Sequence, residues 1–161
     1  MKREQKKKVV IAGNFGVGKT SLIRQFVHSI FSDKYLTTIG VKIDKKSINL
    51  DNDLVHLIIW DITGPKHKEK ANPLHLKGTH GFIYVCDLSR PSTFEDIDQK
   101  INEILNFTGV VPTIRVGNKS DLLSPIKLEK MARQLGLDFT SSAKLNLGVE
   151  ELFAEMARKF V

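Results

Sequence analysis

The chain has 161 residues, of which 41% are apolar and 27% are charged, and these values are typical of one folded domain of ordinary size. They exclude a chain that is disordered or collagen-like throughout. The formal net charge is +7, and much of that excess lies in residues 1–8, which hold five basic residues and one acidic residue.

Residues 1–8 are predicted to form a flexible basic tail, and residues 9–161 a single domain. A basic tail can contact nucleic acid or anionic lipid, and that is the alternative to a solvated tail. This segment is short and has no aromatic side chains that stack on bases. We therefore predict no nucleic-acid partner.

The first half of the domain contains strand and helix patterns that surround a glycine-rich loop. A β-branched run at 9–12 precedes the loop, and residues 19–28 have helical periodicity after it. Two further strands, 41–50 and 54–60, are separated by a tight turn and predict an antiparallel hairpin. The apolar run 81–87 predicts a buried strand.

The second half of the domain continues the alternation of helices and strands. Ser92 and Glu95 have the spacing of a capping box at the start of a helix that Gly109 can end in the left-handed conformation. Ser124 followed by proline predicts another helix start, and Gly136 its end. The remaining expected elements are strands at 113–117 and 137–140 and a last helix with an apolar face of Val149, Leu152, Phe153, Met156 and Phe160.

This alternation predicts an α/β fold with a mostly parallel sheet, helices on both faces and the hairpin at one antiparallel edge. In such sheets, ligands bind beyond the carboxyl ends of the strands.

Cysteine content and hydropathy indicate the compartment. Cys86 is the single cysteine, which excludes an intrachain disulfide, and its apolar surroundings predict a buried side chain. No signal peptide is evident, and no apolar run approaches the roughly 18–20 residues that span a bilayer. There is no terminal cysteine motif for a prenyl group, so we expect no lipid anchor in this chain. The prediction is a cytoplasmic protein, with any membrane contact made through a partner.

The glycine-rich loop matches the phosphate-binding pattern G-x-x-x-x-G-K-[ST]. Its backbone N–H groups can surround phosphate oxygens, and the following helix adds its positive end. Lys19 is expected to contact the β- and γ-phosphates, and the hydroxyl of Thr20 is a hard oxygen ligand for Mg²⁺. A glycine turn that binds nothing is the alternative, but the strand before and the helix after match the required context. The predicted contacts are Asn14, Phe15, Gly16, Val17, Gly18, Lys19, Thr20 and Ser21.

Two further positions are candidate sensors of the metal and the γ-phosphate. Asp61 ends a predicted strand and precedes Gly64 in a D-x-x-G pattern, so its carboxylate can hold Mg²⁺ through water while the Gly64 amide meets the γ-phosphate. The hydroxyl of Thr38 can complete the metal shell when the third phosphate is present. Lys19, Thr38 and Gly64 are the candidate catalytic residues. A turn aspartate and an ordinary loop threonine are the alternatives.

A base pocket is predicted from two short motifs. The N-K-x-D motif comprises Asn118, Lys119 and Asp121, and the Asp121 carboxylate can accept bonds from N1 and the 2-amino group of guanine. Adenine lacks both donors, so it would leave that carboxylate partly unpaired. The second motif is Ser142-Ala143-Lys144, whose Ala143 N–H can donate to the guanine O6.

In this order, the four elements resemble those of the Ras-superfamily small GTPases, nearest the Rab and Ras branches. Residues 31–41 (FSDKYLTTIGV) are similar to a Rab-like first switch, and residues 60–64 (WDITG) to W-D-T-A-G. Residues 77–88 (KGTHGFIYVCDL) are similar to the strand after the second switch. The resemblance covers roughly residues 8–161.

The resemblance implies the P-loop small GTPase fold, with a six-stranded sheet, and a guanine nucleotide switch that uses Mg²⁺. It implies that Phe31 stacks on the base edge and that Lys119 lies over the other face. It also implies an effector protein that binds residues 35–43 and 61–75, and an exchange factor or activating protein as further partners.

Two residues depart from the family pattern. Pro65 stands where the family usually has the glutamine that orients the attacking water, and proline has neither an amide side chain nor a backbone N–H. Phe15 stands where Ras relatives often have glycine, so its ring is expected to crowd the γ-phosphate and to exclude an arginine finger. We predict slow GTP hydrolysis. Residues 66–70 are interpreted as a solvated, mobile second switch, and replacement of the glutamine by Lys66 or His67 is the less favoured alternative. His75 and His80 lack zinc-site partners and are interpreted as structural.

Several functions remain open at this point. The first is a slow GTPase switch, and the alternative is a GTP-loaded interaction module that is nearly hydrolysis-deficient. A P-loop ATPase or kinase is disfavoured by Asn118 and Asp121. A nucleic-acid binder that uses the basic tail is the least favoured.

Overall fold

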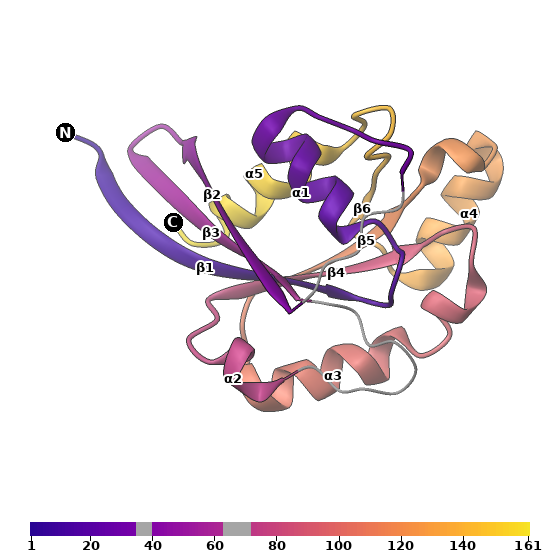
Figure 1. The fold of residues 1–161 in the computed structure, drawn as a ribbon, viewed down its shortest axis with the longest axis horizontal. Helices are drawn as coiled ribbons and strands as arrows, with labels where there is room; N and C mark the ends of the chain where they lie inside the picture. Colours follow the sequence, from indigo (N-terminus) through magenta and orange to yellow (C-terminus); the bar gives the residue numbers. More distant parts are fainter. Residues whose placement is uncertain (35–39, 63–71) are drawn as a thin grey trace.

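The computed structural model describes residues 1–34, 40–62 and 72–161, and its centre is a six-stranded sheet (Figure 1). The strand order is β2-β3-β1-β4-β5-β6; every neighbouring pair is parallel except β2 and β3, which form the antiparallel hairpin. The predicted mostly parallel sheet with one antiparallel edge strand is confirmed. The strands are β1 Arg3–Gly13, β2 Val41–Asn49, β3 Asp53–Ile62, β4 Gly81–Asp87, β5 Thr113–Asn118 and β6 Phe139–Thr140.

Helices cover both faces of the sheet, as Figure 1 shows for α1 and α5 on one side and α2 and α3 on the other. One core cluster lies under α1 and α5, where the rings of Phe26 and Phe153 stack with centroids 4.0 Å apart. A second cluster lies under α3 and includes Tyr84 and Ile101. The helices are α1 Lys19–His28, α2 Pro73–Leu76, α3 Ile97–Thr108, α4 Pro125–Leu135 and α5 Val149–Arg158, with 3₁₀ turns η1 Pro91–Thr93 and η2 Ser120–Leu122.

The prediction of a flexible tail is wrong for residues 3–8. Strand β1 begins at Arg3 and pairs in parallel with β3 from Asp53 onward. The basic side chains have specific partners: Arg3 Nε lies 2.7 Å from a carboxylate oxygen of Asp53, and Lys8 Nζ lies 3.7 Å from the centroid of the Trp60 ring. Lys8 also donates to the carbonyls of His75 and Lys77, so this part of the chain is held by tertiary contacts.

The predicted start of the third helix is also wrong. Ser92 lies in the short turn η1, and α3 begins at Ile97 after Asp96, whose side chain makes no capping bond. The buried hydroxyl of Thr93 bonds to the backbone of Asp87 and thereby fixes a separate turn before the helix. Gly109 does end α3 with a positive φ of 77°, but its ψ of −176° is extended, not the left-handed helical value that we expected.

The other predicted helix ends agree with the structure. Ser124 Oγ accepts the N–H of Lys127 at the start of α4, and Gly136 ends that helix in the left-handed conformation. The short helix α2 was not expected from the sequence. Within the part of the chain that the structure describes, no helix has the length and apolar character needed to span a bilayer.

Candidate functional site

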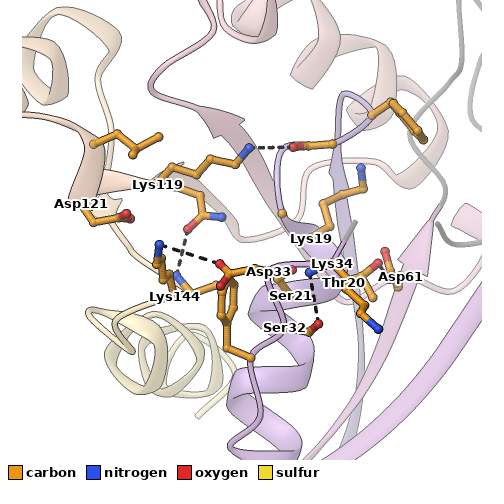
Figure 2. Close-up of a pocket in the computed structure, with 17 residues that line it drawn as sticks. Lys19, Thr20, Ser21, Ser32, Asp33, Lys34, Asp61, Lys119, Asp121 and Lys144 are labelled. Atoms are coloured by element: carbon orange, nitrogen blue, oxygen red, sulfur yellow. Dashed lines mark hydrogen bonds and ion pairs between the residues drawn. The ribbon is translucent and has the colours of Figure 1, made fainter. Parts of the chain in front are cut away.

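A pocket of about 310 Å³ lies at the carboxyl ends of the parallel strands (Figure 2). It is formed by the loop between β1 and α1, the segment after α1, the end of β3 and the loops after β5 and β6. This is the edge of the sheet where the motifs predicted a ligand. The predicted residues that line it are Phe15, Gly16, Gly18, Lys19, Thr20, Ser21, Phe31, Asp61, Asn118, Lys119, Asp121, Ala143 and Lys144.

Three predicted residues lie beside the pocket without lining it. The Val17 side chain is buried in the core, and its carbonyl accepts a bond from Asn118 Nδ2 at 3.0 Å. The side chain of Asn14 is directed to α3, where its Oδ1 accepts from Lys100 at 2.8 Å. Ser142 is buried and donates its hydroxyl to Asp121 at 2.7 Å.

Side-chain donors fix the backbone of the glycine-rich loop. Lys19 Nζ donates to the carbonyls of Gly13 at 2.9 Å and Asn14 at 3.0 Å. Lys119 Nζ donates to the carbonyl of Gly16 at 3.1 Å (Figure 2). With the bond from Asn118 to Val17 and one from Arg90 to Phe15 at 3.1 Å, five consecutive carbonyls are bonded. In a planar trans peptide the C=O and the following N–H point in opposite directions, so these bonds also fix the orientation of the amides.

Gly18 shows why this loop needs glycine next to the helix start. Its φ is 101°, which side chains other than glycine rarely adopt. A Cβ at this position would lie 2.3 Å from Asn118 Nδ2. The close approach lets the loop and the β5 end contact each other directly.

Lys19 brings a buried positive charge to the pocket. Lys19 is only 6% exposed. This burial lowers the pKa of its ammonium group from 10.5 to about 8, although the negative charge of Asp61 opposes the shift. An anion placed beside the ammonium would favour the charged form. The site is therefore suited to a ligand that carries several negative charges.

Thr20 and Asp61 bring two hard oxygen ligands together. The Thr20 hydroxyl donates to a carboxylate oxygen of Asp61 at 2.5 Å, and Asp61 is 1% exposed. A hydroxyl and a carboxylate in contact at the end of the phosphate loop are the oxygen ligands that Mg²⁺ prefers. The residues present thus fit the predicted magnesium ion. Among the residues that the structure describes, no group of three His, Cys, Asp or Glu side chains could hold a metal on its own.

The loop after β5 is held by a buried network around Asn118. Asn118 Oδ1 accepts from Ser141 Oγ at 3.1 Å and from the N–H of Ala143 at 3.3 Å. Lys119, directly after β5, has a positive φ of 64°, and its Nζ lies 2.7 Å from the carboxylate of Asp87 at the end of β4. Burial would raise the pKa of Asp87, but the bonds from Lys119 and Ser89 outweigh burial and lower it.

Four pocket residues were not predicted from the sequence: Ser32, Asp33, Lys34 and Leu122. Asp33 Oδ1 lies 3.8 Å from Lys144 Nζ, which links the segment after α1 to the loop after β6 (Figure 2). Leu122 directly follows Asp121 of the base motif, so the sequence could have predicted that it lies at the pocket. His80 accepts the backbone N–H of Lys8 at 2.9 Å, in line with a structural role.

Five residues named from the sequence lie outside the described part of the chain: Thr38, Gly64, Pro65, Lys66 and His67. The predicted effector segments 35–43 and 61–75 are described only at 40–43, 61–62 and 72–75.

The sheet, the glycine loop before α1 and the motif after β5 define the class of P-loop proteins with the small GTPase fold. A model of the Ras family matches residues 8–161, and the chain belongs to this family. It is 34% identical to human Ras-related protein Rab-32 over 99% of this chain and 76% of the relative. It is 32% identical to Ras-related protein Rab-21 of Dictyostelium discoideum over 98% of this chain and 78% of the relative. The chain is thus a Rab-like small GTPase, a class of GTP-binding molecular switches.

Proposed function

We propose that this chain binds GTP and GDP with Mg²⁺ in the pocket described above and hydrolyses GTP slowly. The observation that carries the proposal is the convergence of three separate motifs on one pocket, with Lys119 bonded to the phosphate loop and Ala143 bonded to Asn118. A chance match of any one motif would not bring the others beside it. The arrangement supports one ligand that extends from the phosphate loop to Asp121.

Guanine selection rests on Asp121. Its Oδ1 accepts the Ser142 hydroxyl at 2.7 Å, which orients the carboxylate. A guanine edge would offer N1–H and the 2-amino group to this carboxylate, whereas adenine offers neither donor. The N–H of Ala143 is the donor for the guanine O6, and its 3.3 Å bond to Asn118 is long enough to be shared. Phe31 and the stem of Lys119 would enclose the base.

Phosphate binding rests on the loop amides and on Lys19, the candidate catalytic lysine. In the pocket, the Lys19 ammonium bonds to the carbonyls of Gly13 and Asn14 in the loop. Phosphate oxygens within reach of this ammonium would accept charge-assisted hydrogen bonds from it, which are stronger than bonds between neutral groups. A preorganised cation of this kind also stabilises the charge that develops when the γ-phosphate leaves.

Thr20 and Asp61 would hold Mg²⁺, with Thr38 as a third ligand and Gly64 as an amide donor to the γ-phosphate. When bound, the metal neutralises charge on the β- and γ-phosphate oxygens. The chain's own contribution is the contact between the Thr20 hydroxyl and the buried Asp61 carboxylate, which places both oxygens before the ligand arrives.

The proposed slow hydrolysis rests on the residues at two positions, Pro65 and Phe15. Pro65 cannot orient water through an amide, and Phe15, with its large side chain, is one of the residues that line the pocket. Intrinsic hydrolysis by Ras is on the order of 10⁻⁴ per second, and an arginine finger adds roughly 10³–10⁵-fold. We propose a rate at or below that intrinsic scale and a weak response to a finger. A nearly hydrolysis-deficient, GTP-bound interaction module is the second candidate, favoured by the same two residues.

The family implies effector, exchange and activating partners in general. We propose that an effector binds the surface formed by residues 35–43 and 61–75 when GTP is bound. We also propose a cytoplasmic location in which any membrane contact is made through a partner.

Two measurements test the proposed function. Nucleotide released from the purified protein after denaturation is identified and quantified: retained GTP supports slow turnover, and GDP indicates efficient hydrolysis. Calorimetry on nucleotide-free protein in Mg²⁺ buffer then compares GDP, GTP and ATP. Binding of both guanine nucleotides with no binding of ATP is expected. Absence of heat for GDP and GTP on folded protein would overturn the proposal.

A further inference from the structure

The connection between β4 and α3, together with the first turn of α3, contacts the half of the phosphate loop that precedes Gly16. Arg90 Nη2 donates to the carbonyl of Phe15 at 3.1 Å, and Lys100 Nζ donates to Asn14 Oδ1 at 2.8 Å. Asn14 Nδ2 in turn donates to the carbonyl of Ser92 at 3.3 Å. Arg90 and Lys100 belong to none of the nucleotide-binding motifs, yet they bond to two consecutive loop residues.

The connection is itself held rigidly by Thr93. Its fully buried hydroxyl accepts the N–H of Asp87 at 2.9 Å and lies 2.8 Å from the carbonyl of Arg90 and 3.0 Å from that of Asp87. The N–H of Arg90 also donates to the carbonyl of Asp87 at 3.0 Å. The backbone that presents Arg90 to the loop is therefore fixed to the end of β4.

Asp87 joins this connection to the base motif. Its fully buried carboxylate lies 2.7 Å from Lys119 Nζ and 3.8 Å from Arg90 Nη1. Those two cations donate to the carbonyls of Gly16 and Phe15, which are neighbours in the loop. One buried anion thus holds both cations beside consecutive peptide groups.

We infer that Arg90 and Lys100 are positioning residues for the phosphate loop: they hold Asn14 and Phe15 in the conformation that receives the terminal phosphate. The inference rests on the proposed nucleotide site. Loop amides that are fixed before the ligand arrives bind it more tightly, because less conformational entropy is lost on binding. Residue 15 is expected from the sequence to face the γ-phosphate, which GDP lacks, so the effect is expected to be larger for GTP than for GDP.

The Arg90 side chain is 44% exposed, so its 3.8 Å ion pair with the buried Asp87 carboxylate helps to place Arg90 but contributes little to stability. The positioning role itself comes from hydrogen bonds to the loop. Arg90 bonds to the backbone carbonyl of Phe15. Lys100 bonds to the Asn14 side chain, which itself bonds to the carbonyl of Ser92. Hydrogen bonds that involve a charged group are stronger than bonds between neutral groups.

Arg90→Met and Lys100→Met test the inference, with Lys130→Met on the exposed surface of α4 as the matched control. Each protein is loaded with fluorescent GDP or with a fluorescent, non-hydrolysable GTP analogue, and release is followed after addition of excess unlabelled nucleotide. Release of the GTP analogue is expected to be about tenfold faster in each variant, with a smaller change for GDP. The control should match the wild type.

A double-mutant cycle checks that Lys100 acts through Asn14. Asn14→Ala should speed release of the GTP analogue as Lys100→Met does. The variant that carries both substitutions should release the analogue no faster than either single variant. Lys100→Arg, which retains a donor, should restore slow release. Additive effects in the double variant would overturn the assignment of Lys100.

The possible outcomes separate this inference from the proposed function. If wild-type protein binds no guanine nucleotide, the proposed function fails. If the wild type binds and the Arg90 and Lys100 variants release nucleotide at its rate, the inference alone is overturned. Equal acceleration for GDP and the GTP analogue, together with a lower Tm, would show a merely structural role and would also overturn it.

Discussion

The base side and the γ-phosphate side of the pocket are built in different ways. On the base side, Asp121 bonds to Ser142, and Ala143 bonds to Asn118, so motif residues hold one another. On the other side, Phe15 departs from the family pattern, and its carbonyl is held by Arg90 from outside the motifs. The proposed recognition of guanine therefore depends on contiguous motifs, whereas the proposed hydrolysis rate depends on scattered residues.

This difference has a physical origin. A base contacts a few donors and acceptors that must lie at fixed positions, and short motifs after two neighbouring strands provide them. Hydrolysis depends on how water and the γ-phosphate are arranged, and small displacements change its rate greatly. The same fold can therefore keep its ligand while its turnover changes.

The largest effect is expected on the base side, from Asp121→Asn. The amide group would face the guanine N–H donors with a donor of its own, so affinity for GDP should fall by at least about 100-fold. Calorimetry in Mg²⁺ buffer measures the change. Asp51→Asn, in the exposed turn between β2 and β3, is the matched control and should bind as the wild type does. A loss of less than about tenfold in Asp121→Asn would contradict the guanine assignment.

On the γ-phosphate side, Pro65→Gln is expected to increase the rate of GTP hydrolysis, and this change is smaller than the loss of affinity in Asp121→Asn. An amide that can orient water should raise the single-turnover rate of GTP hydrolysis by about tenfold and at most roughly 100-fold. Adding Phe15→Gly should raise the rate further if the ring excludes water. Binding of GDP should stay unchanged in Pro65→Gln.

The opposite result would identify a replacement for glutamine. A wild-type rate well above the Ras intrinsic scale that is lost in His67→Ala would show that His67 orients the water. The comparison between the two sides of the pocket would then fail, because the γ-phosphate side would be as complete as the base side.

The sequence predicted the sheet well because the strand patterns are local, as in the run 54–60 that became part of β3. The base motifs are local as well, and the structure places Asn118, Lys119, Asp121, Ala143 and Lys144 around one pocket. The start of α3 was not predictable in the same way. Ser92 and Glu95 have the spacing of a cap, but the bond from Thr93 to the end of β4 stabilises a different turn.

Residues 3–8 show more clearly that contacts between distant parts of the chain cannot be predicted from local sequence. Their composition is that of a solvated tail, and composition carries no information about a partner strand. The parallel pairing with β3, the contact with Asp53 and the Trp60 ring are all distant in sequence. The roles of Arg90 and Lys100 are likewise invisible in the motifs, because those residues lie more than seventy positions from the loop carbonyl and side chain that they contact.

The pH dependence of binding sharpens the comparison, because Lys19 lies at the junction between the two sides. Its pKa of about 8 means that the free protein loses this proton as the pH rises above 8, while the nucleotide-bound form should keep it. Affinity for GDP should therefore be constant from about pH 7 to 7.5 and fall by up to about tenfold between pH 8 and 9. Calorimetry in buffers of different ionisation enthalpy should detect proton uptake at pH 9 and almost none at pH 7. No uptake at pH 9 would contradict a lowered Lys19 pKa.

The smallest effect on binding is expected from deletion of residues 2–5, at the end of β1 that is far from the pocket. Affinity for GDP should stay within about twofold, because both sides of the pocket lie at the other end of that strand. The Tm should fall by several degrees, since Asp53 loses its bonds from Arg3 and Gln5.

The bond from Arg3 holds the pKa of Asp53 below its usual range, so this stabilisation is complete at neutral pH and is lost as the pH falls through the folded pKa. The Tm difference between the two proteins should therefore narrow in acid; equal Tm values at neutral pH would show that the first residues of β1 add no stability.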